Sequence, residues 1–209
     1  MTDHDSDVMS AAEMLALADH EQRAAAQSFV PDDRLLYSVW GVAWGVGSLA
    51  RWSTAGDSPR IDASYASGWL LGLLLATAFV VTVLHIKGRV GGIYGRSARL
   101  GRLHGATWAV TFTAYGLISA GLGRADVSYE IATVMASVLP CFIVGILYMS
   151  GATLWEDLLQ FFLGAWIVLV SGVAVLIGFP DHFLVLAIGG GGGFVVAAGL
   201  AARRDWTTR

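Results

Sequence analysis

The stretch Leu158–Ile177 reads LLQFFLGAWIVLVSGVAVLI, and it decides the class of this protein. It contains no Asp, Glu, Lys or Arg. A helix needs about 20 mostly apolar residues to cross the hydrocarbon core of a bilayer. A helix also satisfies its own backbone hydrogen bonds, which a chain in contact with lipid must do. The stretch therefore predicts a membrane-spanning helix.

Similar apolar stretches lie on both sides of this one. Four of them are long enough to cross a membrane: Gly68–Ile86, Leu103–Leu122, Tyr129–Ser150 and Phe183–Ala202. One more, Leu35–Ala50, is slightly short, but Arg34 and Arg51 can extend from its two ends toward the interfaces. We therefore expect an all-α fold, an integral membrane bundle of six transmembrane helices.

The composition of the whole chain supports this class. Of the 209 residues, 56% are hydrophobic and 14% are charged, whereas a soluble domain carries about 25% charged residues. The mean hydropathy is +0.63. A net charge of −3 argues against a nucleic-acid-binding protein. The single cysteine, Cys141, excludes an intramolecular disulfide and a cysteine-based metal site, and no metal or other cofactor is expected.

The distribution of Lys and Arg predicts the orientation. Six spans place the N-terminal segment, the loop Lys87–Arg102 and the C-terminal tail on one side, with ten Lys and Arg residues. The other side carries three, namely Arg51, Arg60 and Arg124. Because positive loops stay in the cytoplasm, we expect both termini there and the protein in the cytoplasmic (plasma) membrane.

Three regions follow: an acidic segment 1–34, a transmembrane domain 35–202 and a basic tail 203–209. The first region holds eight acids against Arg23 and Arg34 and lacks the basic start of a signal peptide. Ser10 and Glu13 have the spacing of a capping box, and good helix formers run to about Gln27. They predict a weakly amphipathic cytoplasmic helix, whose acidity suits the basic loop or a partner protein better than an anionic membrane.

Two ladders of polar side chains recur every four residues in neighbouring spans, which keeps each ladder on one helix face. Pro140 frees a backbone carbonyl within the second ladder. The ladders predict a polar groove for a small solute, with these lining residues: Thr107, Thr111, Tyr115, Ser119, Thr133 and Ser137. The alternative is that the hydroxyls bond the carbonyls of their own helices and pack those helices closely.

A basic cluster begins the third span, where other spans begin with acids. It consists of Arg96, Arg99, Arg102 and His104 and follows a glycine-rich approach. A helix N-terminus with converging guanidinium groups predicts an anion site, and an anionic lipid headgroup is the expected ligand. The alternatives are the positive-inside bias alone, or pairing with the acids at residues 32, 33, 156 and 157. Of the histidines, only His85 and His104 are expected near spans, at the cytoplasmic edge, where packing or headgroup contact is expected.

Five consecutive glycines, Gly189–Gly193, interrupt the sixth span. Either another helix presses against them, at positions three or four residues apart on one face, or the helix unwinds beside a cavity. Gly41 and Gly45 form a second candidate for a close helix contact.

The sequence leaves three functions open. The first is binding or passage of a small neutral or zwitterionic solute across the membrane. The second is a non-catalytic membrane subunit or regulator that docks a cytoplasmic partner through the N-terminal helix and the basic loop. A second copy of the chain is the other partner considered. The third is a membrane enzyme acting on a lipid or isoprenoid, which is disfavoured because no acid lies inside a span.

Overall fold

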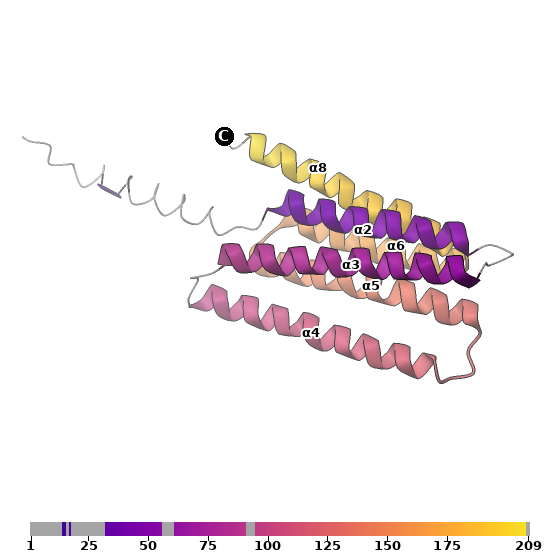
Figure 1. The fold of residues 1–209 in the computed structure, drawn as a ribbon. Helices are drawn as coiled ribbons and strands as arrows, with labels where there is room; N and C mark the ends of the chain where they lie inside the picture. The colour runs from indigo at the N-terminus through magenta and orange to yellow at the C-terminus, as the bar shows by residue number, and fades with distance from the viewer. Residues whose placement is uncertain (1–13, 16, 18–31, 56–60, 91–94, 208–209) are drawn as a thin grey trace, which may run out of the picture.

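The computed structural model describes residues 14, 15, 17, 32–55, 61–90 and 95–207, and this part of the chain is helical without a β-strand. Within it, the long helices are α2 (Asp33–Thr54), α3 (Ile61–Val90), α4 (Arg96–Leu122), α5 (Tyr129–Trp155) and α6 (Leu158–Ile177). The last segment is composite, because α7 (His182–Val185), the π-helical turn η1 (Leu186–Gly191) and α8 (Gly192–Thr207) follow one another without a break. The helices lie side by side, and α2 begins where α8 ends (Figure 1). The predicted all-α class is confirmed.

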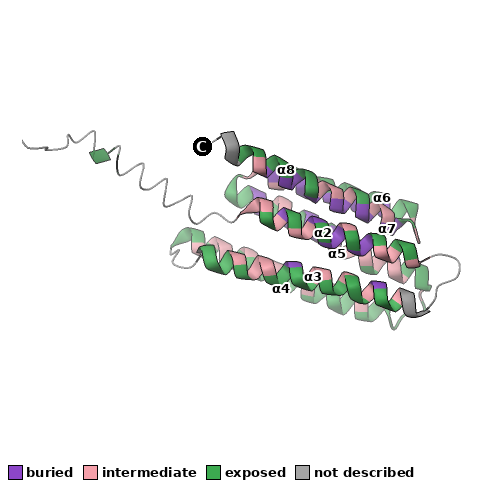
Figure 2. Ribbon diagram, turned by 45° about the horizontal axis from the view of Figure 1, so that its top comes forward, coloured by how far each residue is buried: buried purple, intermediate pink, exposed green. Residues whose placement is uncertain are grey.

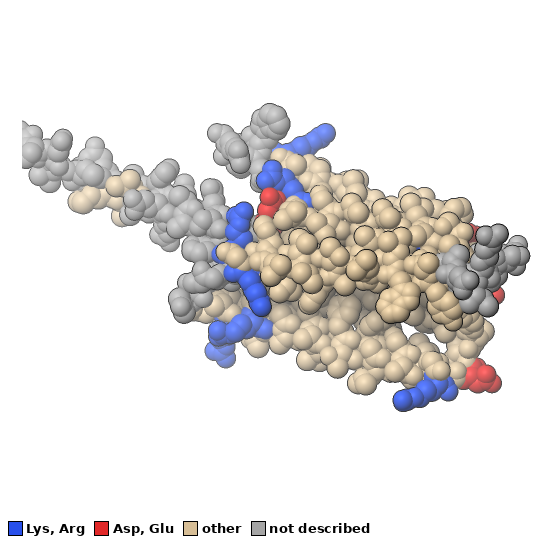
Figure 3. All heavy atoms as spheres, viewed as in Figure 1, with Lys and Arg blue, Asp and Glu red and all other residues tan. Residues whose placement is uncertain are grey.

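Four of these segments are long and apolar enough to cross a membrane: Ser64–Arg89, Tyr129–Trp155, Leu158–Ile177 and His182–Arg204. Charged side chains gather at the two ends of the bundle, and uncharged ones cover its middle (Figure 3). The protein is therefore embedded in a membrane. The predicted spans Leu35–Ala50 and Leu103–Leu122 are helical, in α2 and α4, but they do not reach the hydropathy of the other four. The arrangement with six spans stays a prediction.

Acidic and hydroxyl side chains start several of the helices. The carboxylate of Asp32 accepts hydrogen bonds from the backbone of Arg34 and Leu35, and Asp157 does the same at the start of α6. These contacts satisfy amides that a helix leaves unpaired in its first turn. Glu156 ends α5 in the left-handed conformation (φ 56°).

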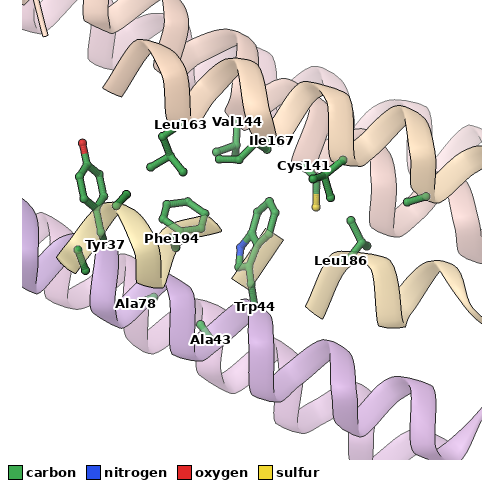
Figure 4. Packing of buried hydrophobic residues seen from close by; sticks show 14 of the residues in the cluster. Tyr37, Ala43, Trp44, Ala78, Cys141, Val144, Leu163, Ile167, Leu186 and Phe194 are labelled. Atoms are coloured by element: carbon green, nitrogen blue, oxygen red, sulfur yellow. The ribbon is translucent and has the colours of Figure 1, made fainter. Parts of the chain in front are cut away.

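The core lies between α2, α5, α6 and the composite segment. Ile167 and Phe194 are completely buried, and Trp44 packs edge-on against Phe194 with ring centroids 5.6 Å apart. Figure 4 shows these side chains filling the space between the helices. Since lipid is as apolar as leucine, close packing of this kind is what holds membrane helices together.

Four of the five glycines lie in close helix contacts, and the two predicted contact sites pack on each other. A Cβ added at Gly191 would lie 2.7 Å from the Cα of Gly45. The predicted single contact face is wrong: α6 packs against Gly189 and Gly193, while α2 packs against Gly190 and Gly191. The helix is also rewound into the π turn here, and the indole of Trp166 donates to the carbonyl of Gly189 at 2.8 Å.

Helices α3 and α4 lie at the periphery, where Figure 2 shows few buried residues. No residue of α4 is buried, and it packs mainly on α5. Helix α3 packs on α2, where Trp40 donates to the hydroxyl of Thr82 at 3.0 Å. The predicted N-terminal helix lies outside the described residues, apart from residues 14, 15 and 17.

Candidate functional site

A pocket of about 570 Å³ opens at the end of the bundle where α2 ends and α3 and α5 begin. It has walls from α2, α3, α5 and α7, which are formed by Arg51, Ser64, Tyr65, Gly68, Trp69, Leu71, Tyr129, Thr133, Ala136, Ser137 and Phe183. The opposite end of the bundle carries the start of α2 and the end of α8 (Figure 1). In the predicted orientation, the pocket therefore opens on the non-cytoplasmic side.

Arg51 brings a positive charge to this pocket. Its Nη1 donates to the carbonyl of Ser64 at 2.8 Å and lies 3.3 and 3.4 Å from the hydroxyls of Ser64 and Ser67. The guanidinium carbon lies 5.1 Å from the ring centroid of Phe183. Asp181 accepts a hydrogen bond from Trp52, and among the described residues no carboxylate forms an ion pair with Arg51. Neutral groups thus hold the guanidinium in the pocket wall.

Ser137 and the fully buried His182 form a hydrogen-bonded chain behind the pocket. The Ser137 hydroxyl donates to the carbonyl of Thr133 at 2.8 Å, and the His182 Nε2 lies 2.9 Å from the same hydroxyl oxygen. The Nδ1 of the same imidazole is buried and has no hydrogen-bond partner among the described residues. The contact between His182 and Ser137 joins α7 to α5.

The structure brings together only part of the predicted lining. Thr133 and Ser137 of α5 lie in the pocket wall. Thr107 and Thr111 of α4 are not among its residues, and their hydroxyls donate to carbonyls of their own helix at 3.0 and 2.7 Å. This is the bonding that the alternative interpretation expects. The hydroxyl oxygen of Ser119 is buried and has no hydrogen-bond partner among the described residues.

Tyr115 does not line the pocket, but it contacts a residue of the pocket wall. Pro140 has no N–H, which leaves the carbonyl of Ala136, four residues earlier, without its helical partner. The Tyr115 hydroxyl of α4 donates to this carbonyl at 2.7 Å. Since Ala136 belongs to the pocket wall, Tyr115 holds α4 against the wall from behind.

At the basic end, three members of the predicted anion site are exposed. Arg96, Arg99 and Arg102 lie in the first turns of α4 and make no ion pair with another described residue. His104 does not lie with these exposed arginines. Its Nε2 accepts a hydrogen bond from the Trp108 indole at 2.9 Å, and its ring packs edge-on against Trp155 of α5.

Two of the acids at this end have other partners. Asp32 pairs with Arg34 at 3.1 Å and Asp157 with Arg204 at 3.5 Å. The hydrogen-bonded guanidinium of Arg34 lowers the pKa of the Asp32 carboxyl below its usual value. The backbone N–H of Asp32 also donates to the Nε2 of His85 at 2.9 Å, which ties the start of α2 to α3.

Sequence reasoning missed two residues of the pocket region. It took Arg51 as a residue that ends a span, and it did not include His182, which directly precedes a span, among the histidines near spans. Nothing in the spacing shows that His182 faces Ser137, 45 residues earlier. The available signal was that both residues border spans on the same predicted side of the membrane.

No protein family matches the sequence, and no curated protein or solved structure matches the chain. The function is therefore inferred from the residues and their geometry.

Proposed function

We propose that this membrane protein binds a small neutral or zwitterionic solute in the pocket between α2, α3, α5 and α7. The supporting observation is that hydroxyls and one guanidinium, from helices far apart in sequence, converge on one open pocket of about 570 Å³. Small-molecule sites are typically concavities of about 300–1,000 Å³ with mostly apolar walls and a few polar groups. The pocket has this size and this mixture.

The geometry supports binding of a solute in the pocket. Passage of the solute through the bundle would require a further step. The pocket lies at one end of the bundle, whereas the middle is filled by Trp44, Ile167 and Phe194. A solute that crosses between the core helices would have to displace these side chains. Protein interiors are close-packed and change arrangement in discrete steps, so transport would need a second conformation.

A second candidate function is that of a membrane subunit or regulator. The observation in its favour is that α4 buries none of its residues and contacts mainly α5. Figure 3 shows the molecule hollowed between α4 and the helices above it. A partner chain that packs against α4 would cover surface that the monomer leaves open, and cross-linking from α4 in native membranes would identify it.

The pocket is tested with the purified protein in lipid nanodiscs and a panel of amino acids, betaines and polyols. A ligand that binds only the folded protein stabilises it by RT ln(1 + [L]/Kd), about 2.7 kcal/mol at 100 times Kd. We expect at least one solute of the panel to raise the Tm of the wild type. Thr133→Val, which removes one pocket hydroxyl at nearly constant shape, should reduce this rise.

The matched control is Thr111→Val, which removes a hydroxyl of α4 outside the pocket wall and should leave the rise unchanged. An equal loss in both variants would place the solute elsewhere. A panel without any stabilising solute would contradict the proposed function.

A further inference from the structure

The pocket contains a positive charge, which distinguishes between a neutral and a zwitterionic solute. The inference drawn from it rests on the proposed function. We infer that Arg51 is an anion-binding residue, and that the ligand of the pocket carries a carboxylate or phosphate group that docks on its guanidinium. This favours a zwitterionic ligand over a neutral one.

The first argument is the charge of Arg51. Arginine stays protonated in proteins, and this side chain is half-buried in the pocket wall. Its contacts with described residues are the neutral oxygens of Ser64 and Ser67 and the ring of Phe183, and no described carboxylate pairs with it. A cation drawn out of water without a counter-charge is unfavourable, and more so near a bilayer. The positive charge of the pocket is thus available to an anion.

The second argument is the geometry of the guanidinium. Its hydrogen bonds to described residues all come from Nη1. Nε and Nη2, which together form the side-on edge of the group, make none. This edge is the one that grips two oxygens of a carboxylate or phosphate in parallel hydrogen bonds. The Nη1 contacts hold the group in place and leave that edge for a ligand.

The third argument is the rest of the wall. The hydroxyls of Thr133 and Ser137 come from α5, and three aromatic side chains, Tyr65, Trp69 and Tyr129, remain 68%, 79% and 63% exposed. Aromatic faces attract a cationic nitrogen, and they also suit an apolar group. A ligand with an anionic end and a cationic or apolar end matches this combination.

A ligand with an anionic oxygen group can reach Arg51 from two sources. One is a water-soluble zwitterion, as the proposed function requires, and the other is the phosphate of a phospholipid headgroup that enters from the bilayer. Both dock an anionic oxygen group on Arg51, and the experiment below separates them.

The first arm uses acetate as the anionic probe and acetamide as its neutral counterpart of the same shape, at equal ionic strength in a neutral detergent. Acetate should raise the Tm of the wild type by about 2–4 °C more than acetamide does. Arg51→Gln, which keeps a donor for the Ser64 carbonyl, should abolish the difference. Arg51→Lys should retain part of it, because the charge remains while the two-donor edge is lost.

The control is Arg124→Gln, which removes an exposed arginine from the loop after α4 and should preserve the acetate effect. Equal stabilisation by acetate and acetamide in the wild type would overturn the inference. So would a loss of the acetate effect in Arg124→Gln as large as in Arg51→Gln. If Arg51→Gln fails to fold, Arg51→Lys serves in its place, and the acetate effect should then be reduced relative to the wild type.

The second arm compares phosphatidylglycerol and phosphatidylethanolamine adducts of wild type and Arg51→Gln by native mass spectrometry. Equal adducts, together with an acetate effect that depends on Arg51, support the soluble zwitterion. Loss of the adducts in Arg51→Gln supports a headgroup on Arg51, which leaves this inference standing and contradicts the proposed solute. The two failures are therefore distinguishable.

Discussion

Tyr115 shows how one side chain connects a peripheral helix to the pocket. Its hydroxyl satisfies the Ala136 carbonyl that Pro140 leaves unpaired. An unsatisfied carbonyl is expensive at membrane depth, where no water replaces the partner. Both residues of this contact could be selected from the sequence, Pro140 as a proline within a predicted span and Tyr115 as a member of a polar ladder. Their pairing could not be predicted, since it depends on the relative height of α4 and α5.

We predict that Tyr115→Phe lowers the free energy of unfolding by about 1–3 kcal/mol, because a donor is removed and the acceptor stays. In a Pro140→Ala background, the new N–H can bond to Ala136, and the same change should cost less. Denaturation in mixed micelles measures the four unfolding free energies of this double-mutant cycle.

The control for this cycle is Tyr129→Phe. Tyr129 is 63% exposed and its hydroxyl makes no hydrogen bond to another described residue, so we expect little change. An equal cost of Tyr115→Phe with and without Pro140 would show that the tyrosine acts through some contact other than the freed carbonyl.

At the scale of elements, the composite segment α7–η1–α8 explains which part of the fold was predictable. Hydropathy and length indicated a helix from Phe183 to Ala202, and a helix is there. The glycine run indicated close approach, and Gly191 does contact Gly45 of α2. The π turn was not predictable, because it depends on simultaneous contacts with α2 and α6. The local sequence carries no information about both neighbours at once.

A Gly→Ala series across this run tests the contacts. Gly191→Ala should destabilise by about 1–3 kcal/mol, because the added methyl meets the backbone of Gly45. Gly192→Ala has open space within 4 Å and should stabilise by up to about 1 kcal/mol, because alanine is the better helix former. The opposite signs at adjacent positions make the pair its own control, and thermal melts in detergent measure both. Stabilisation at both positions would refute the close contact.

Part of the candidate site could likewise be predicted from the sequence, and part of it could not. The spacing of Thr133 and Ser137 was enough to select them, because residues four apart share a helix face. Arg51 and His182 were visible only as residues that border spans, since their roles depend on α2, α5 and α7 meeting at one end. The α4 ladder was included by the same periodicity, and the hydroxyls of Thr107 and Thr111 bond within their own helix. Periodicity identifies a face, whereas the neighbour of that face comes from the tertiary structure.

For the whole molecule, the arrangement of the helices and the charge distribution point to one topology. Charged side chains lie at the two ends of the bundle (Figure 3), and α2 begins at the end where α8 finishes (Figure 1). Six spans would assign ten Lys and Arg residues to that end and three to the other, and the positive-inside rule then predicts that the pocket lies outside the cytoplasm. This orientation determines which solutes the pocket meets.

The most direct test is cysteine labelling in intact cells. In a Cys141→Ser background, Ser58→Cys lies between α2 and α3 and Ser97→Cys lies in the first turn of α4. A membrane-impermeant thiol reagent should label position 58 and leave position 97 unlabelled, and permeabilised cells should show labelling at both. Labelling of position 97 in intact cells, alone or together with position 58, would contradict the bundle of six spans with both ends inside.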